Sequence, residues 1–430
     1  MVLASAGLLA ACGDVSQIAE QETWGPNPRL GEVHHSLIPT VHVADAQGWP
    51  AGAQPTAAQG WRVTAFATGL QHPRWLYVLP NGDVLVAESN KPQPAEDKEH
   101  NRVKAFFMSL FQKKAGAGVP SADRITLLRD ADGDGAAETK SALVEHLRSP
   151  FGMALVGDQL YIANADSIVK VPFKAGDMRI AGEPSKVTDL PSGINHHWTK
   201  NILAGRDGAK LYATVGSNSN VGENGQPAEE GRAAIWEVDL ATGNKRLLAS
   251  GLRNPNGLGW EPSTNALWAV VNERDELGSD LVPDYLTSVQ DGAFYGWPWS
   301  YWGQHVDVRV DPPNPQKVAA AKVPDYALGN HVAPLGLAFS DGKLPAPFAS
   351  GAFVGEHGSW NRKPFAGYKV VFVPFEGGKP RGLPVDFLTG FLSPDGKALG
   401  RPVGVALDGK GGVLVADDVG NAVWRVAPAR

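Results

Sequence analysis

The chain has 430 residues, of which 43% are hydrophobic and 20% charged, an ordinary composition for a globular protein. The net charge of −6 and the pI near 6.0 argue against a nucleic-acid-binding or basic membrane-surface protein, and a single cysteine excludes an intramolecular disulfide. Fifty glycines and 33 prolines favour many short strands joined by tight turns over a helical fold.

The N-terminal stretch is small and apolar, and it ends in Leu-Ala-Ala followed by Cys12. This sequence resembles the cleavage box of bacterial lipoproteins, in which the cysteine becomes the lipidated first residue. We therefore expect residues 1–12 to be a lipoprotein-type signal segment and the protein to be periplasmic or anchored to the cell envelope through Cys12. A truncated ordinary signal peptide, or an apolar start with an unrelated cysteine, are the alternatives. No apolar run reaches the roughly 18 residues that a membrane-spanning helix needs.

Residues 13–60 are irregular and contain five prolines, which is typical of an extended tether or a strap over the fold. From residue 61 onward, one unit recurs six times with variable spacing. It consists of a turn, a short apolar strand, a polar turn and a second apolar strand that ends near an acidic or amide residue. The copies span residues 72–88, 149–164, 197–216, 254–272, 333–356 and 401–417.

A fixed motif at variable spacing is typical of a propeller with loop insertions. We therefore predict an all-β fold, a six-bladed β-propeller over residues 61–430. The strand-like segment Trp61–Ala67 precedes the first copy, and we expect it to close the ring by pairing with the last blade, which removes exposed sheet edges.

Two insertions interrupt the repeats, near residues 90–120 and 273–332. In the first, apolar residues between 101 and 114 follow helical spacing, which predicts a short helix on the side of the propeller or, alternatively, a membrane or partner contact. The second contains an aromatic-rich run at 294–302, which is compatible with the wall of a sugar or cofactor pocket and equally with packing between blades.

The first strand of each propeller blade lines the central channel, so the turns before these strands meet at one mouth. This places a histidine (His197, beside His196) near Arg253, Asn254 and Arg401. Histidine can take a proton from a hydroxyl group, and arginines bind planar anions through paired hydrogen bonds. One base among several arginines suits the oxidation of an alcohol with a bound polyanionic cofactor.

Four segments, 197–208, 251–258, 292–298 and 401–409, carry a family resemblance that covers roughly residues 61–428. The chain resembles the soluble quinoprotein sugar dehydrogenases, which are six-bladed propellers that use pyrroloquinoline quinone (PQQ) and calcium, and it looks most like their sorbosone dehydrogenase-like branch. The resemblance implies oxidation of aldoses, sorbosone-like sugars or other sugar aldehydes. It also implies transfer of the electrons to a periplasmic or membrane acceptor, a cytochrome or a quinone.

The resemblance also implies roles for individual residues. His197 matches the general base, and Arg253 matches the arginine that polarises the quinone oxygen and the substrate. Asn254 matches a residue that hydrogen-bonds the cofactor, and Arg401 matches one that binds a cofactor carboxylate.

The other cofactor contacts and the calcium ligands follow from looser matches. The segment 358–363 adds Arg362 and Lys363 as cofactor-binding candidates. The calcium ligands of the family are largely backbone carbonyls after the second strand of the fourth blade, which correspond to Glu273 and Arg274. This chain reads Asn-Glu-Arg-Asp-Glu there in place of a Gly-Pro turn.

A separate acidic motif contains Asp130, Asp132, Asp134 and Glu138. Carboxylates at alternate positions around a glycine turn match the first half of a calcium loop, but Ser141 stands where the bidentate glutamate would be. The motif therefore predicts either a structural calcium site or a polar turn held by its own side chains.

Two other classes of function remain open at this point. A metal-dependent lactonase on a six-bladed propeller would use convergent carboxylate and amide ligands, for which Glu88, Asn164, Asn218 and Asp417 are candidates, and it would not need Arg253. A lipid-anchored scaffold would have neither cofactor nor activity.

Overall fold

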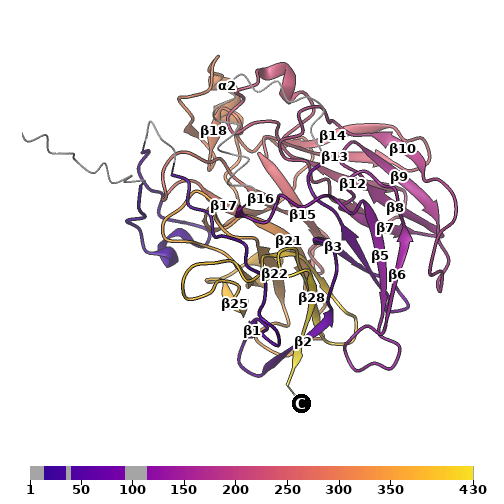
Figure 1. Cartoon of the computed structure of the whole chain (residues 1–430). Coiled ribbons are helices and arrows are strands. Elements are labelled where there is room, and N and C mark those ends of the chain that lie inside the picture. The colour runs from indigo at the N-terminus through magenta and orange to yellow at the C-terminus, as the bar shows by residue number, and fades with distance from the viewer. Residues whose placement is uncertain (1–13, 35–39, 93–113, 430) are drawn as a thin grey trace, which may run out of the picture.

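Six antiparallel sheets form a ring in the computed structural model, which describes residues 14–34, 40–92 and 114–429 (Figure 1). The prediction of an all-β, six-bladed propeller is confirmed. Cys12 and the predicted signal segment lie outside the described residues, as does nearly all of the predicted helix at 101–114. Among the described residues, no helix is long and apolar enough to cross a membrane.

Each blade is built on four strands. We number the six blades I to VI in chain order. Blade I contains β3 (Pro73–Val78), β4 (Val84–Glu88), β5 (Arg124–Arg129) and β6 (Thr139–Val144). Blade II contains β7 (Met153–Val156), β8 (Gln159–Ala163), β9 (Ser167–Pro172) and β10 (Ser185–Asp189). Blade III contains β11 (Ile202–Ala204), β12 (Lys210–Val215), β13 (Ala234–Asp239) and β14 (Lys245–Ser250).

Blade IV contains β15 (Asn254–Trp260), β16 (Leu267–Asn272), β17 (Pro283–Ser288) and β20 (Tyr326–Asn330). Blade V contains β21 (Pro334–Phe339), β22 (Gly351–Glu356), β23 (Lys369–Glu376) and β25 (Val385–Thr389), extended by β1 (Thr56–Ala57) and β24 (Lys379–Pro380). Blade VI contains β26 (Pro402–Leu407), β27 (Val413–Asp417), β28 (Ala422–Pro428) and β2 (Trp61–Ala67).

The ring closes through blade VI, where β2 from the start of the propeller pairs antiparallel with β28 from its end. Closure of the ring by Trp61–Ala67 is thus confirmed. The pairing joins the two ends of the chain in one sheet and leaves no unpaired edge on β28, since its other side pairs with β27.

Four of the six opening turns contain the sequence Pro-x-Gly, at residues 150–152, 255–257, 334–336 and 402–404, and this pattern has a packing reason. A Cβ atom on Gly336 in β21 would lie 2.2 Å from the carbonyl oxygen of Val403 in the neighbouring innermost strand. The same clash would occur at Gly152 in blade II, where the backbone nitrogen of Ile202 would lie 2.3 Å away. Glycine therefore allows the innermost strands to approach one another closely around the channel.

The innermost strands β3, β7, β11, β15, β21 and β26 all begin at one face of the ring, which we call the entry face. Because each blade is an antiparallel meander, its second strand ends at the entry face too, whereas the turn between its third and fourth strands lies at the opposite face. The segments that carry His197, Arg253 and Arg401 all belong to the entry face.

The N-terminal segment runs along this face before it joins the sheets. Its residues form isolated parallel bridges from His42 to Asn361 and from Ala46 to Ala398, and Ser16 donates its backbone N–H to the carbonyl of Lys363 at 2.8 Å. Further on, β1 pairs with β25 at the outer edge of blade V. The described part of residues 14–60 therefore covers the loops of blades IV to VI.

The insertion in blade IV contains a two-stranded hairpin, β18 (Ser300–Tyr301) and β19 (His305–Val306), and the short helix α2 (Pro315–Ala320). The aromatic run packs mainly into the core of this blade, where Tyr295, Tyr301 and Trp302 are buried. These three rings therefore have a structural role in packing within and between blades. Trp297 instead hydrogen-bonds a residue of the candidate site, as described below.

Candidate functional site

His197 lies in the turn before β11, and its ring is fixed from one side. Its Nδ1 lies 2.9 Å from the carbonyl oxygen of Ser217 and 3.0 Å from the Ser217 hydroxyl. A carbonyl can only accept a hydrogen bond, so Nδ1 carries the proton and Nε2 keeps its lone pair. The geometry therefore presents an imidazole in the tautomer that a general base requires.

Arg253 precedes β15 and is 3% exposed. Its guanidinium makes four hydrogen bonds, to the carbonyl of Glu273 at 2.6 Å, to the carboxylate of Asp275 at 2.7 Å and to two oxygen atoms of Asn220. A guanidinium group has five N–H bonds, and these contacts use four of them. Among the described residues, the second N–H of Nη1 is therefore left to bind another acceptor. The side chain is thus a rigidly held cation with one donor to spare.

His197, Arg253 and Asn254 lie together on the entry face. Ser217, which holds the ring of His197, also donates its backbone N–H to the carbonyl of Arg253 at 2.8 Å. A Cβ atom on Gly216 would lie 2.4 Å from Asn254 Oδ1 and 2.6 Å from His197 Cβ, so both residues flank that glycine. Blades III and IV therefore bring the predicted base, the arginine and the amide to one place.

The charge of Arg253 acts on His197. The ring is half-buried, and the loss of hydration lowers the pKa of His197 well below its ordinary value, to which the positive charges of Arg253 and of Arg232 add. A histidine in this environment is neutral at neutral pH and ready to accept a proton.

Arg401 occupies the corresponding position in blade VI. Its guanidinium donates to the carbonyl of Ala44 at 3.2 Å and lies 4.9 Å from the centre of the Tyr368 ring. It is 3% exposed, and among the described residues no carboxylate lies within ion-pair distance, while its Nε has no partner. A buried cation without an anion is an energetic cost that an anionic ligand would relieve.

Arg362 and Lys363 lie under the N-terminal segment. Arg362 Nη2 donates to the hydroxyl of Ser16 at 3.0 Å, and its Nη1 donates to the carbonyl of Pro364 at 3.0 Å. Lys363 accepts from Ser16 through its carbonyl. Both residues belong to the entry face, but the guanidinium of Arg362 points to the strap rather than to His197 or Arg253.

In the turn predicted to bind calcium, two arginine side chains donate hydrogen bonds to backbone carbonyls. The carbonyl of Glu273 accepts from Arg253, and Arg274 is 1% exposed, forms an ion pair with Asp307 and donates to the carbonyl of Asp275. Burial raises the pKa of the Glu273 carboxyl to about 8. Backbone and side-chain oxygens are available in this turn, and guanidinium groups already use two of the carbonyls.

Three residues that support the site were not identified from the sequence. Asn220 accepts from Arg253 and from the indole N–H of Trp297 at 2.8 Å, so the aromatic run supports the arginine through Asn220. Asp275 is the carboxylate partner of Arg253, which lowers the pKa of Asp275 to about 2 against the effect of its burial. Ser217 holds His197. The sequence feature that points to Ser217 and Asn220 is the polar run directly after β12, because that strand ends at the entry face.

A second charged group lies across the ring, around the buried Asp418. Its Oδ2 forms an ion pair with Arg74, lies 2.9 Å from His357 Nε2 and 3.5 Å from His72 Nε2. The guanidinium of Arg74 also lies 5.7 Å from the ring of Trp198, next to His197. This group links blades I, V and VI to the turn that carries the candidate base.

The candidate lactonase ligands each have a structural task within their own blade. Each accepts a backbone N–H from the turn that opens the blade: Glu88 from Gln71, Asn164 from Arg148, Asn218 from Asn195 and Asp417 from Arg401. These contacts explain why the second strands end in acidic or amide residues.

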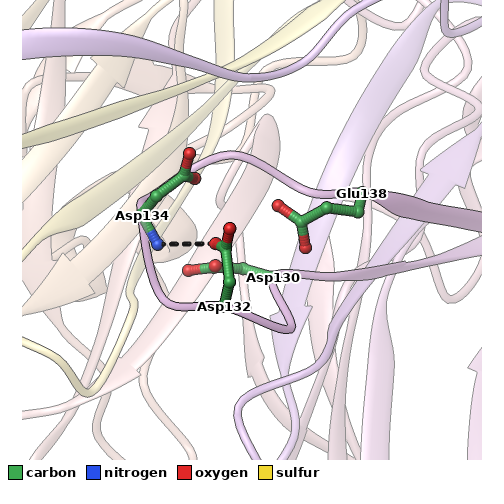
Figure 2. Close-up of side chains that lie close together, drawn as sticks. All are labelled: Asp130, Asp132, Asp134 and Glu138. Carbon is green, nitrogen blue, oxygen red and sulfur yellow. Dashed lines mark hydrogen bonds between the residues drawn. The ribbon is translucent and has the colours of Figure 1, made fainter.

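The acidic loop between β5 and β6 lies at the face opposite the entry face. Figure 2 shows the carboxylates of Asp130, Asp132, Asp134 and Glu138 around one tight turn, and one ligand atom from each lies within 4.8 Å of the others. Backbone N–H groups of the same turn already bond to these side chains, for example Gly133 to Asp130 at 2.7 Å. Calcium binding by this loop stays a prediction, separate from the chemistry of the entry face.

Substituting Asp132 with alanine tests that prediction. If the loop binds calcium, isothermal titration of the variant with calcium will show one site fewer than the wild-type protein, because a carboxylate ligand is lost. An unchanged stoichiometry would show that the loop is only a polar turn. Asp395→Ala, which removes an exposed acid that pairs with Lys397, is a matched control.

Known proteins resemble this chain in sequence and in fold. A family model described as TrAA12-like matches residues 121–285 and 315–429. A protein of Borreliella burgdorferi without an assigned function is 28% identical over 300 residues, which cover 66% of this chain and 77% of that protein.

Two fungal proteins share the fold. The pyrroloquinoline quinone-dependent pyranose dehydrogenase of Coprinopsis cinerea is 23% identical over 374 residues, or 75% of this chain and 45% of the enzyme. The holo form of its PQQ domain superposes with a TM-score of 0.69 at 20% identity and covers 90% of this chain and 100% of that domain. A Trichoderma reesei enzyme of carbohydrate-active family AA12 gives a TM-score of 0.70 at 18% identity and covers 91% of this chain and 100% of that one. Because the family model matches more than half of the chain, the protein belongs to the TrAA12-like family of PQQ-dependent oxidoreductases.

Proposed function

We propose that the protein oxidises a sugar at its hemiacetal or aldehyde carbon, with PQQ as the hydride acceptor, calcium beside the cofactor and His197 as the general base. The observation that carries this proposal is the shared anchor at Ser217, which joins a correctly tautomeric His197 to Arg253 on the entry face. The names of the relatives support a sugar as substrate, and aldoses and sorbosone-like sugars are the classes to test first.

The residues of the entry face fit a planar polyanion. Arg401 is a buried cation without a carboxylate partner among the described residues, which suits an anionic group of the cofactor. The side-chain oxygen of Asn254 is buried without a hydrogen-bond partner, so it can accept from an N–H or O–H of a ligand. We assign Arg401 and Asn254 to hold the cofactor, with Arg362 and Lys363 as further candidates nearby. When bound, PQQ supplies a two-electron acceptor for the hydride that leaves the sugar.

The chain's own part in the reaction is positioning and proton transfer. The Nε2 of His197 takes the proton of the anomeric hydroxyl as the C–H bond breaks, so the hydroxyl carbon becomes a carbonyl and the cyclic sugar becomes a lactone. We assign the spare N–H of Arg253 to stabilise negative charge that develops on the reacting oxygen atom. Calcium is assigned to the Glu273–Arg274 turn, through oxygen atoms other than the Glu273 carbonyl, which already accepts from Arg253.

Reconstitution tests this function directly. The purified protein is mixed with PQQ, with and without calcium, and a panel of aldoses and sugar aldehydes is offered with an artificial dye as electron acceptor. Bleaching of the dye with at least one sugar supports the proposal, and no bleaching with any sugar overturns it. Lactone hydrolysis by the Arg253→Ala variant in a parallel assay would favour a hydrolase instead.

Acid tolerance follows from the environment of His197. The pKa of His197 is lowered from the ordinary 6.5, and a base works only when it is unprotonated. The acidic limb of kcat/KM should therefore bend below pH 6.5, and activity should persist into mildly acidic solution. A pH profile with the preferred sugar checks this, and a bend above pH 7 would contradict it.

Replacing Arg401 with methionine is expected to weaken cofactor binding while the fold is retained. The variant loses the cation that we assign to a cofactor carboxylate, and a charge-assisted hydrogen bond contributes about 1.5–3 kcal/mol, or roughly 10- to 150-fold in Kd. Titration with PQQ followed by tryptophan fluorescence measures the loss. The exposed Arg381, which pairs with Glu376 far from the entry face, provides a control as Arg381→Met. Equal affinities of the two variants would remove Arg401 from the cofactor site.

We further propose that the electrons pass to a cytochrome or quinone in the periplasm or the membrane and that Cys12 carries a lipid anchor. Both proposals rest on the sequence pattern of the N-terminus and on the family resemblance.

A further inference from the structure

Two buried cations lie directly behind the turn that carries His197. Lys200 has 0% exposed surface and Arg232 has 5%. Among the described residues, neither has a carboxylate within ion-pair distance, so their positive charges are not cancelled by direct contact. Cations of this kind are rare inside proteins because burial removes their hydration. Their contacts indicate what offsets that cost.

Every hydrogen bond from these two side chains goes to the segment 191–198. Lys200 Nζ donates to Asn195 Oδ1 at 2.9 Å and lies 3.4 Å from the carbonyls of both His197 and Trp198. Arg232 Nη2 donates to the same Asn195 oxygen at 3.0 Å and to the carbonyl of His197 at 3.2 Å.

Arg232 also reaches the beginning of the segment. Its Nη1 donates to the carbonyls of Pro191 at 2.9 Å and Ser192 at 3.3 Å. The segment contains no strand, so most of its carbonyls have no partner in a sheet, and buried carbonyls need donors. The two side chains supply those donors and hold the turn against blade III from within.

We propose that Arg232 and Lys200 are positioning residues for His197: from inside blade III both fix the backbone of the turn that carries the imidazole, and Arg232 also places positive charge behind it. Neither is assigned to contact the sugar or the cofactor. The proposal rests on the proposed function of His197 as the base, and it extends the catalytic machinery into the interior of the blade.

The two residues divide the task. The pKa of Arg232 is lowered by burial to about 10, which leaves it protonated at neutral pH, and its charge contributes to the lowered pKa of His197. The pKa of Lys200 is lowered well below its ordinary value by burial and by Arg232. Arg232 therefore carries the electrostatic part of the proposal and Lys200 the geometric part. The other groups that act electrostatically on His197, Lys200 or Arg232 are His196, Arg253, Asp166 and Glu229.

The electrostatic part is tested by titrating His197 in the protein without added cofactor. In Arg232→Met, the pKa of His197, followed by NMR of histidine-labelled protein and assigned with His197→Asn, should rise because a nearby positive charge is removed. Arg246→Met, which removes an exposed arginine from β14 of the same blade, should leave the titration unchanged. An unchanged pKa of His197 in Arg232→Met, with a native-like spectrum, would overturn the proposal.

The geometric part is tested by kinetics. In Lys200→Met, kcat should fall about tenfold or more while KM stays within about twofold, because the lost contacts orient the base and do not bind the sugar. The control is Lys210→Met, which removes a more exposed lysine of β12 in the same blade. A KM effect as large as the kcat effect, or no effect, would overturn the positioning role.

The two arms separate this proposal from the proposed function. If the wild-type protein reconstituted with PQQ oxidises no sugar, the proposed function fails, yet the NMR titration still decides whether Arg232 controls His197. If Lys200→Met loses its cooperative melting transition, the Arg232→Met titration decides alone.

Discussion

Replacing His197 with asparagine is expected to lower kcat/KM for sugar oxidation by about 10²–10⁴-fold, the usual contribution of a positioned general base. Asparagine can still reach the carbonyl of Ser217 through its amide, so the turn should keep its conformation. The loss therefore reports the missing proton acceptor. Steady-state kinetics with the reconstituted enzyme measure it, and a PQQ titration shows that the cofactor still binds.

His196 is the matched control, since it is the adjacent residue and its ring centre lies 4.8 Å from that of His197. It lies more exposed than His197 in the same turn. His196→Asn should cause a much smaller loss. If the two variants lose activity equally, His197 has no special role and another group is the base.

If His197 is not the general base, the next candidate is His357, which lies beside Asp418. His357 Nε2 lies 2.9 Å from that carboxylate, an arrangement in which an acid orients an imidazole. Activity that survives in His197→Asn and disappears in His357→Asn would transfer the role of base to blade V.

The fold was predictable because it repeats. Six copies of one turn-strand-turn-strand unit leave few alternatives, and the Pro-x-Gly of the opening turns reflects a constraint that the structure makes visible, the close approach of neighbouring innermost strands at Gly152 and Gly336. The prediction that Trp61–Ala67 closes the ring followed from the same logic, because an unpaired strand before the first copy has one free edge to join.

The site was predictable only in part. A histidine or arginine at an opening turn can be assigned to the entry face by counting the repeats, and this assignment places His197, Arg253 and Arg401 on the same face. Their partners could not be found in this way, because Asn220 and Asp275 reach Arg253 from loops whose conformation no repeat determines. The same limit applies to Arg362, whose guanidinium contacts Ser16 about 350 positions away in the chain.

The predicted calcium turn shows a further limit. The family resemblance pointed to Glu273 and Arg274, and both residues lie in the turn that follows β16. Only the structure shows that the side chain of Arg274 folds back into the protein, because its partner Asp307 comes from the insertion of blade IV. Side-chain direction within an irregular turn depends on such distant partners.

This ion pair gives the largest expected effect on stability. Both side chains are 2% exposed, so Asp307→Ala leaves a buried arginine without its carboxylate, and removing one partner of such a pair costs about 3–5 kcal/mol. Urea unfolding followed by tryptophan fluorescence measures the loss. Arg309→Ala, which breaks the more exposed ion pair with Glu276, should cost less than about 1 kcal/mol. Equal losses in the two variants would contradict the burial argument.

The double variant Arg274→Met/Asp307→Leu separates the stability of the pair from its role in the site. Apolar residues of similar volume can replace a buried pair at little cost, so much of the lost stability should return. Activity should not return with it. Arg274 also donates to the carbonyl of Asp275, and Asp275 holds Arg253, so the double variant removes one of the contacts that fix the turn beside the candidate arginine. A stable double variant with lower kcat would show that the insertion of blade IV positions Arg253, whereas full activity would show that Asn220, Asn361 and the backbone are sufficient to hold Asp275 in place.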